Sequence, residues 1–202
     1  LALRTDLPYR DVNDLRKAAS PIIIGTTGPA ESSHQFTTLI KEFLGLNLKL
    51  ISYLSGAEIN LALERKEVDG RAASYSGIKA YIERGFLRPL IRGRVAEPGV
   101  ENLPVDEDLV TDPIGKTIMG LRSAPERMGR PYVASPKTPP EALNILRVAF
   151  AKVAKDQEVK EESGKLLMQV EYVSGDECLQ ISNNILNQPE RMIKEVSKYI
   201  KF

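Results

Sequence analysis

The residues best suited to chemistry lie in the segment Gly25-Thr-Thr-Gly-Pro-Ala-Glu-Ser-Ser-His34, directly after the β-branched run Pro21–Ile24. From Phe36 to Leu44 the apolar residues then recur at helical spacing. A strand that ends in small hydroxyl residues and opens a helix leaves backbone N–H groups facing outward, and the positive end of the helix dipole adds to them. This turn therefore favours binding of a carboxylate or another oxyanion.

A purely structural interpretation of the same turn also stays open. Ser32 and Gln35 have the spacing of a capping box, which explains two polar residues without any ligand. It does not explain Thr26, Thr27 and Gly28, which precede the cap. A nucleotide P-loop is excluded, because the required loop length and the Lys-Ser/Thr pair are absent.

Two further turns of this kind follow predicted strands. The segment Ser55-Gly-Ala-Glu58 again has capping-box spacing, yet Ser55 and Gly56 still present N–H groups. Tyr53, which ends the preceding strand, could line a pocket with its ring or its hydroxyl. The turn Ser74–Gly77 is also rich in Ser and Gly. All three turns are candidates for one anion site.

Arg71 stands inside Val68–Ser74, a segment that otherwise suits a buried strand. A buried guanidinium needs a partner, because an unpaired buried charge is costly. An internal acid such as Asp69 is the structural explanation. The functional alternative is that Arg71 clamps the carboxylate of a ligand with two parallel hydrogen bonds.

Enzyme chemistry has little support. The single histidine, His34, and the single cysteine, Cys178, could in principle form a nucleophilic pair. However, Cys178 shares an apolar helical face with Ile181 and Ile185, and His34 is better explained as a helix residue satisfied by its neighbours. No HExxH, GxSxG or paired-carboxylate motif is present, and one cysteine excludes a multi-cysteine metal site. We expect no catalysis, metal or cofactor.

The first hundred residues alternate predicted strands with predicted helices. The strands are expected at Leu1–Arg4, Pro21–Gly25, Leu48–Tyr53, Val68–Ala73 and Leu87–Ile91, and the helices at Val12–Ala19, Ser33–Leu44, Ala57–Lys66 and Gly77–Arg84. Repeated βαβ units imply an α/β fold with a parallel sheet that is covered on both faces. Ligands bind beyond the carboxyl ends of such strands, where the three turns would meet.

The second half of the chain is predicted to be mostly helical. A proline-rich excursion, Ala96–Pro113, precedes an expected helix at Lys116–Arg127 and a short strand at Pro131–Ala134. Three later helices are expected to begin at Thr138-Pro-Pro-Glu141, Ser174-Gly-Asp-Glu177 and Asn187-Gln-Pro-Glu190. Their apolar faces have few strands to cover, so we expect that a preceding part of the protein supplies another sheet.

Composition narrows the class of protein. The 202 residues include 28 basic and 27 acidic residues, and 42% are hydrophobic, so the chain can bury a real core. Basic residues form no stripe, which argues against a nucleic-acid partner. No apolar run approaches the roughly 18 residues that cross a bilayer, and Leu1–Leu15 does not read as a signal peptide. We therefore expect a chain that does not itself span a membrane. Because Leu1–Arg4 reads as a strand with no methionine or leader before it, we also expect a fragment of a longer protein.

An ordered set of motifs is similar to those of one known family. Leu7-Pro-Tyr-Arg-Asp-Val-Asn-Asp-Leu15 is like that family's Ser-Pro-Tyr-Lys-x-x-x-Asp-Leu, and Gly25–His34 is like its Gly-Ser-Ser-Gly-Pro-Gly-Ser-Ser-Ser-His. Tyr53–Glu58, Glu67–Asp69 and Thr138–Glu141 follow in the expected order. The chain resembles the tripartite tricarboxylate transporter receptor family, the Bug-type periplasmic solute-binding proteins.

The resemblance implies a type II periplasmic-binding-protein-like fold, with a parallel-rich sheet flanked by helices and a partial helical second lobe. Residues 1–131 would form the ligand-binding α/β lobe, and residues 132–202 the C-terminal, mostly helical part of the other lobe. The function implied is a periplasmic receptor that delivers a small organic di- or tricarboxylate to the membrane permease subunits of a tripartite transporter. The candidate ligand-binding residues are Thr26, Thr27, Gly28, Pro29, Ser32, Ser33, Tyr53, Ser55, Gly56, Arg71 and Ser74.

Departures from the family pattern bear on the ligand. Ala30 and Glu31 replace Gly and Ser in the first turn, and a carboxylate there is unfavourable for an anion unless it points to solvent. The family often has Asp where Ala73 stands, at a position associated with an amino or hydroxyl group of the ligand. Its absence, together with Arg71, suggests a ligand with more than one acidic group and no ammonium.

Two other functions remain open at this point. One is the ligand-sensing domain of a regulator, which would bring a DNA-binding or signalling segment. The other is a small-molecule enzyme that uses the anion turn for its substrate. A leader peptide upstream would favour the receptor, a helix-turn-helix the regulator, and turnover lost on Cys178→Ala or His34→Ala the enzyme.

Overall fold

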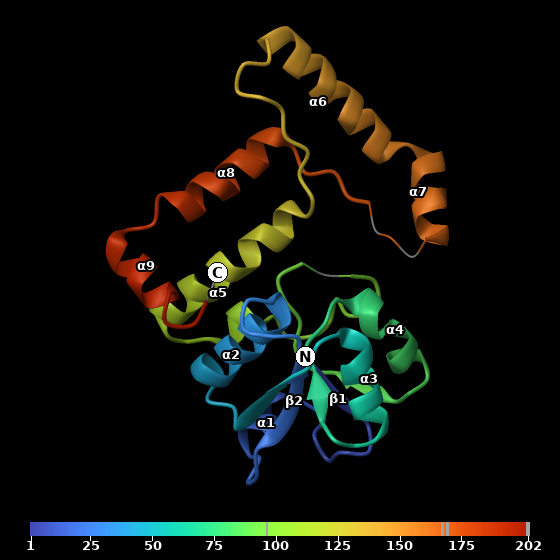
Figure 1. Cartoon of the computed structure of the whole chain (residues 1–202), viewed down its shortest axis with the longest axis vertical. Coiled ribbons are helices and arrows are strands. Elements are labelled where there is room, and N and C mark those ends of the chain that lie inside the picture. The colour runs from blue at the N-terminus through green and yellow to red at the C-terminus, as the bar shows by residue number, and fades with distance from the viewer. Residues whose placement is uncertain (96, 167, 169, 201–202) are drawn as a thin grey trace. The chain divides into compact units, whose positions relative to one another are not determined.

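The computed structural model of the protein describes residues 1–95, 97–166, 168 and 170–200. The chain forms two compact units (Figure 1). Unit 1 holds Leu1–Ser123 together with the segment from Pro189 onward, and unit 2 holds Ala124–Gln188. The last segment thus packs with the beginning of the chain. The expected assignment of 1–131 and 132–202 to two lobes of a receptor stays a prediction.

Unit 1 is built on a sheet whose strand order, in the described part of the chain, is β3-β2-β4-β1-β5. The strands are β1 (Ala2–Arg4), β2 (Ile22–Thr26), β3 (Leu48–Ser52), β4 (Gly70–Arg71) and β5 (Leu87–Pro89). All five lie where the sequence predicts strands, and β4 is shorter than expected. The predicted α/β fold class is confirmed.

One strand runs against the predicted direction. β2 pairs in parallel with β3 and β4, whereas β1 is antiparallel to β4 and β5. The segment between β1 and β2 carries the five-residue helix α1 (Val12–Arg16), and across it the chain reverses its direction in the sheet. The predicted parallel-rich sheet is thus confirmed, with β1 as the strand that departs from the parallel direction.

Helices cover both faces of the sheet, as predicted (Figure 1). They are α2 (Ser32–Leu44), α3 (Gly56–Glu64), α4 (Tyr75–Glu83) and α5 (Pro113–Met128), with a short 3-10 helix at Asp106–Leu109. Ile22 and Ile24 of β2 join α2 and α5 in one core, while Ile23 lies against the second core, formed by α3 and α4. This alternation follows from the two-residue period of a strand.

The remaining helices are α6 (Pro140–Lys155), α7 (Gln157–Lys165) and α8 (Gly175–Leu186) in unit 2, and α9 (Glu190–Val196) in unit 1. After α9, Tyr199 packs edge-on against Phe43, with the ring centroids 5.2 Å apart. Ser174 caps α8 as predicted, since its hydroxyl accepts from the Glu177 amide at 3.1 Å.

Two local predictions in the second half of the chain were wrong. Residues 131–134 form no strand: Tyr132 and Val133 are exposed, and no strand pairs with them in the described part of the chain. The expected cap at Thr138 is also absent, because α6 begins one residue later than that motif requires, with Pro139 at its N-cap and no side-chain cap. Proline can start a helix without a capping hydroxyl, since its fixed φ suits the first turn.

The close approach of α3 to β2 depends on a glycine. A Cβ at Gly25 would lie 2.6 Å from Cγ2 of Ile59, which is fully buried on α3. We predict that Gly25→Ala lowers the free energy of unfolding by about 1–3 kcal/mol, because the added methyl overpacks this contact. Chemical denaturation followed by circular dichroism would measure it.

Gly120→Ala is the matched control within unit 1. A Cβ there would meet no atom closer than Oε2 of Glu107 at 4.0 Å, and the position lies inside α5. Alanine is the better helix former, so this variant should be as stable as the wild type or more stable. Equal stability of Gly25→Ala and the wild type would contradict the close packing described.

Candidate functional site

The carboxyl ends of three adjacent strands meet at one edge of the sheet. β2 lies between its parallel neighbours, with Thr26 opposite Ser52 on β3 and Gly25 opposite Arg71 on β4. Each strand leads into a helix that begins at this edge, namely α2, α3 and α4. The predicted convergence of the three turns is confirmed. Three helix N-termini, each carrying partial positive charge, therefore belong to one edge.

The first turn, residues 26–33, is shaped by its own hydroxyl groups. Thr26 is fully buried, and its Oγ1 lies 3.0 Å from Nδ1 of His34. Thr27 Oγ1 lies 3.1 Å from Ser33 Oγ, to which the Thr27 amide also donates a long bond of 3.5 Å. Gly28 has φ of +134°, a conformation that residues with a side chain rarely adopt. The side chains thus hold the backbone of the turn in place.

The beginning of α2 leaves backbone donors available. Its N-cap is Glu31, which is exposed and makes no side-chain cap. The capping box predicted for Ser32 and Gln35 is therefore absent, and the Gln35 amide group instead donates to Ala30 O at 3.1 Å. Within the residues that the structure describes, no hydrogen bond engages the amides of Ser32 and Ser33. Ser32 and Pro29 are exposed beside them.

The second turn combines a structural cap with free donors. Ser55 Oγ accepts from the Glu58 amide at 3.2 Å, and the Glu58 carboxylate accepts from the Leu54 amide at 3.2 Å. The structural interpretation of Ser55 and Glu58 is thereby confirmed. The amides of Gly56 and Ala57, the first two residues of α3, have no acceptor in the described part of the chain.

The third turn has a carboxylate of the chain itself beside it. Ser74 is exposed at the N-cap of α4 without capping it, and its Oγ lies 3.3 Å from Ser76 Oγ. The side chain of Glu97 lies beside the Tyr75 backbone: burial raises the pKa of Glu97, and the Tyr75 backbone acts in the opposite direction. Glu97 was not among the predicted site residues, since an acid in a proline-rich excursion has no local signal for such a position.

Arg71 lies beneath the first turn of α3. Its side chain is buried, and Nη1 donates to Gly56 O at 2.8 Å and to Asn60 Oδ1 at 2.5 Å. The prediction that Asp69 is the internal partner of Arg71 was wrong. Asp69 instead accepts from the Ile23 amide at 2.8 Å and lies 3.7 Å from Nη2 of Arg4, so it completes the sheet at the start of β4.

Tyr53 and Ala73 belong to the core on the α3 side of the sheet. The Tyr53 amide extends the strand pairing by donating to Thr26 O at 2.8 Å. Burial, and next the Glu67 carboxylate, raise the pKa of the Tyr53 hydroxyl. Tyr53 thus supports the edge through its backbone and packing, and a contact of its side chain with a ligand stays a prediction.

The two residues considered as a nucleophilic pair belong to different units of the chain. His34 lies in unit 1 and Cys178 in unit 2, where Cys178 is half-buried on the same helix as the buried Ile181. Among the described residues, no group of three His, Cys, Asp or Glu side chains is placed to hold a metal ion. No helix in the described ranges is both long and apolar enough to span a membrane.

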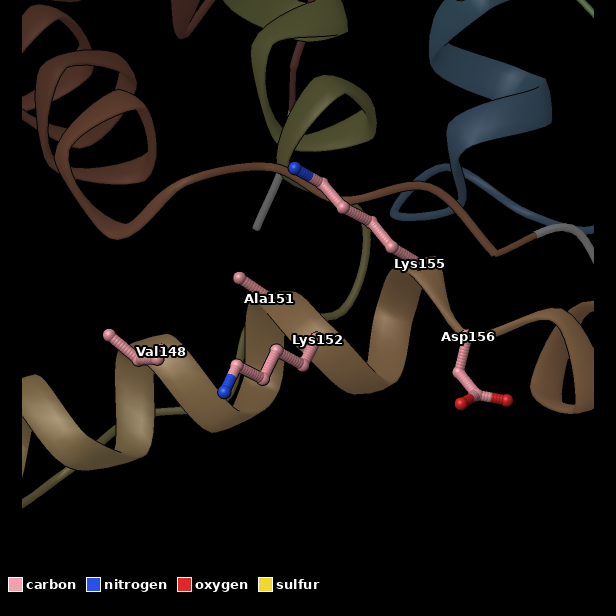
Figure 2. Close-up of a pocket in the computed structure, with 5 residues that line it drawn as sticks. All are labelled: Val148, Ala151, Lys152, Lys155 and Asp156. Atoms are coloured by element: carbon pink, nitrogen blue, oxygen red, sulfur yellow. The ribbon is translucent and has the colours of Figure 1, made fainter.

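A separate hollow of about 420 Å³ lies on α6 in unit 2 and contains none of the predicted site residues. Figure 2 shows Lys152 and Lys155 pointing away from each other along this helix, so their charges do not converge. Asp156 at its end caps α7 by accepting from the Glu158 amide at 2.9 Å. The hollow therefore lacks the converging polar groups of a binding site.

The partial burial of His34 predicts that the stability of the fold depends on pH. Burial lowers the pKa of His34 below its ordinary value of about 6.5, because the fold disfavours the charged ring. The free energy of unfolding should therefore receive this contribution in full above pH 6.5 and lose it as the pH falls through the folded-state pKa. The ring resonances of the single histidine in NMR spectra would report its pKa, and His34→Gln should remove this part of the pH dependence. A midpoint at or above 6.5 would contradict the burial described.

No family model and no curated protein matches the chain. Solved structures do. A TctC solute-binding protein from Polaromonas, solved without ligand, matches with a TM-score of 0.69 at 19% identity, over 96% of this chain and 65% of its own. The R. palustris protein Rpa4515, solved with adipate, matches with a TM-score of 0.60 at 17% identity, over 98% and 63%.

A third structure, described as a periplasmic transporter, matches with a TM-score of 0.59 at 17% identity, over 98% of this chain and 63% of its own. The chain thus spans between 63% and 65% of the length of these three proteins. The expected likeness is confirmed at the level of the fold. Over the part that it covers, the chain shares the fold of a TctC solute-binding protein.

Proposed function

We propose that the chain is part of an extracytoplasmic receptor that binds a small organic di- or tricarboxylate and delivers it to the permease subunits of a tripartite transporter. It does no covalent chemistry on its ligand. Binding would shift an equilibrium between an open and a closed form, and the permease would recognise the closed form. Residues 1–131 would belong to the lobe that holds the anion, and residues 132–202 to the other lobe.

One observation carries this proposal: free backbone donors at two helix N-termini on the same sheet edge. The amides of Ser32 and Ser33 begin α2, and those of Gly56 and Ala57 begin α3, without acceptors in the described part of the chain. Such pairs of N–H groups, aligned with the helix dipole, are a general device for binding oxyanions. Since the Glu97 carboxylate lies beside the start of α4, the anion is expected at α2 and α3.

The surroundings of the turns agree with an anionic ligand. Glu31, the acid nearest to the start of α2, is exposed, so its carboxylate does not have to face the ligand. Arg71 brings a positive charge to the first turn of α3. The similar fold of a protein solved with adipate, a dicarboxylate, supports the same class of ligand. The ligand-contacting residues remain those proposed from the sequence, now centred on the turn 26–33, Ser55, Gly56 and Arg71.

The proposal is tested by measuring ligand binding before and after a negative charge is placed in the first turn of α2. Native mass spectrometry of the protein purified without added ligand should show a small acid bound to it, and calorimetry should show affinity for di- and tricarboxylates. Ser33→Asp should weaken that affinity about tenfold or more, because the new carboxylate occupies the same amides and repels the ligand. Asp is well tolerated in a first helical turn, so the variant should fold.

Gln157→Glu is the matched control, since it adds one negative charge to the first turn of α7, a helix in unit 2. Its affinity for the acid should equal that of the wild type. A protein that binds no carboxylate, or that binds equally well after Ser33→Asp, would refute the proposed anion site.

A further inference from the structure

Arg71 differs from the other buried arginines of the described chain in having no carboxylate partner. Arg122 pairs with Asp106 at 3.2 Å, and Arg4 pairs with Asp6 at 3.0 Å. Arg71, at 7% exposure, forms no ion pair with any described residue, and its Nε has no hydrogen-bond partner. Its positive charge is therefore not compensated within the fold.

A neutral side chain stands where a counter-ion would fit. Asn60 Oδ1 accepts from Arg71 Nη1 at 2.5 Å, and the other acceptor of that nitrogen is the carbonyl of Gly56. Aspartate has the same shape as asparagine and would turn this contact into an ion pair. The fold thus provides hydrogen-bond acceptors for the guanidinium, but both are neutral and do not balance its positive charge.

The uncompensated charge acts at the same point as the free amides of α3. Nη2 of Arg71 lies 3.0 Å from where a Cβ of Gly56 would stand, so a side chain at residue 56 would crowd the guanidinium against the first turn. The guanidinium and the N-terminal end of the helix dipole are both positive there. Because the place is partly buried, water screens the repulsion between them only weakly. An anion bound at this turn removes that repulsion.

The nearby acids do not provide the missing charge. Glu58 accepts from the Leu54 amide, and Glu64 accepts from the hydroxyl of Tyr81 at 2.9 Å. Burial lowers the pKa of Arg71, and the titratable side chain that counteracts this is Tyr81, which is neutral at pH 7. At the position of Ala73 there is no carboxylate that could hold a ligand ammonium.

We infer that Asn60 and Arg71 form a specificity-determining pair: the neutral amide keeps the guanidinium charge available, and the ligand supplies the counter-charge. This inference rests on the proposed function and defines its ligand more closely. Arg71 acts as a positioning residue through the first turn of α3. The site should then prefer an acid with a second carboxylate over the same skeleton with an uncharged end, and reject an ammonium at that end.

The test is Asn60→Asp in the complete protein. Calorimetry would compare α,ω-dicarboxylates of four to six carbons with the monocarboxylate and the ω-amino acid of equal length, at fixed pH and ionic strength. The wild type should bind the dicarboxylates most tightly and the ω-amino acids most weakly. Asn60→Asp should lose about tenfold or more in dicarboxylate affinity and should unfold at a higher temperature, because Arg71 gains an internal partner.

Asn47→Asp is the control for the change in charge. Asn47 is exposed, directly precedes β3 and therefore lies at the opposite end of that strand from the site. It should bind all three ligand classes as the wild type does. Arg71→Gln serves as a second variant: if it folds, it should lose the preference for dicarboxylates over monocarboxylates, whereas Arg71→Lys should keep part of it.

The outcomes separate this inference from the function on which it rests. A wild type that binds no carboxylate overturns the proposed function. A wild type that prefers dicarboxylates, with Asn60→Asp equal to it, overturns the inference alone. If Arg71→Gln lowers the affinity for all three ligand classes equally, and Asn60→Asp binds as the wild type does, the role of Arg71 is structural. That result also overturns the inference.

Discussion

The parallel pairing of β2 with β3 and β4 is the constraint on which the candidate site depends. Because the three strands run in one direction, the helices that follow them all begin at one edge of the sheet. Gly25 allows α3 to lie close over β2, with Ile59 against the strand. A shift of register by one residue would turn the alternating side chains of β2 to the wrong faces, so the two cores also fix where the turns stand.

At this edge positive charge accumulates without an equal amount of negative charge. The N-termini of α2 and α3 keep free amides, and Arg71 adds a buried guanidinium with neutral partners. The start of α4 differs, since the Glu97 carboxylate lies beside the Tyr75 backbone there. Places where a fold leaves polar groups without partners are expected at functional sites, because a structural role alone would favour their pairing. The contrast between the turns thus supports the proposed anion position at α2 and α3.

The sequence predicted the strands and helices at this edge of the sheet better than the partners of the charged and polar groups there. β-branched runs and small polar turns identified β2, β3 and their following helices to within about two residues, and Ser55 and Ser174 were recognised as caps from local spacing. The direction of β1 was not predictable, because hydrophobic periodicity indicates a strand but not whether it runs parallel or antiparallel to its neighbours. Local spacing also misled at Thr138, where proline starts α6 alone. The roles of Asn60 and Glu97 depend on partners 11 and 22 residues away along the chain, which no local pattern indicates.

The site residues all belong to unit 1, and this unit buries its own core on both faces of the sheet. Unit 2 differs, since α6 leaves Ile145, Leu146 and Val153 exposed. The geometry of the turns therefore depends on packing within unit 1. Under the proposed function, closure of the receptor would leave the two free helix N-termini and the charge of Arg71 in the same relation to one another. The proposed selectivity for the charge of a ligand would then be set within this unit, by asparagine in place of aspartate at position 60.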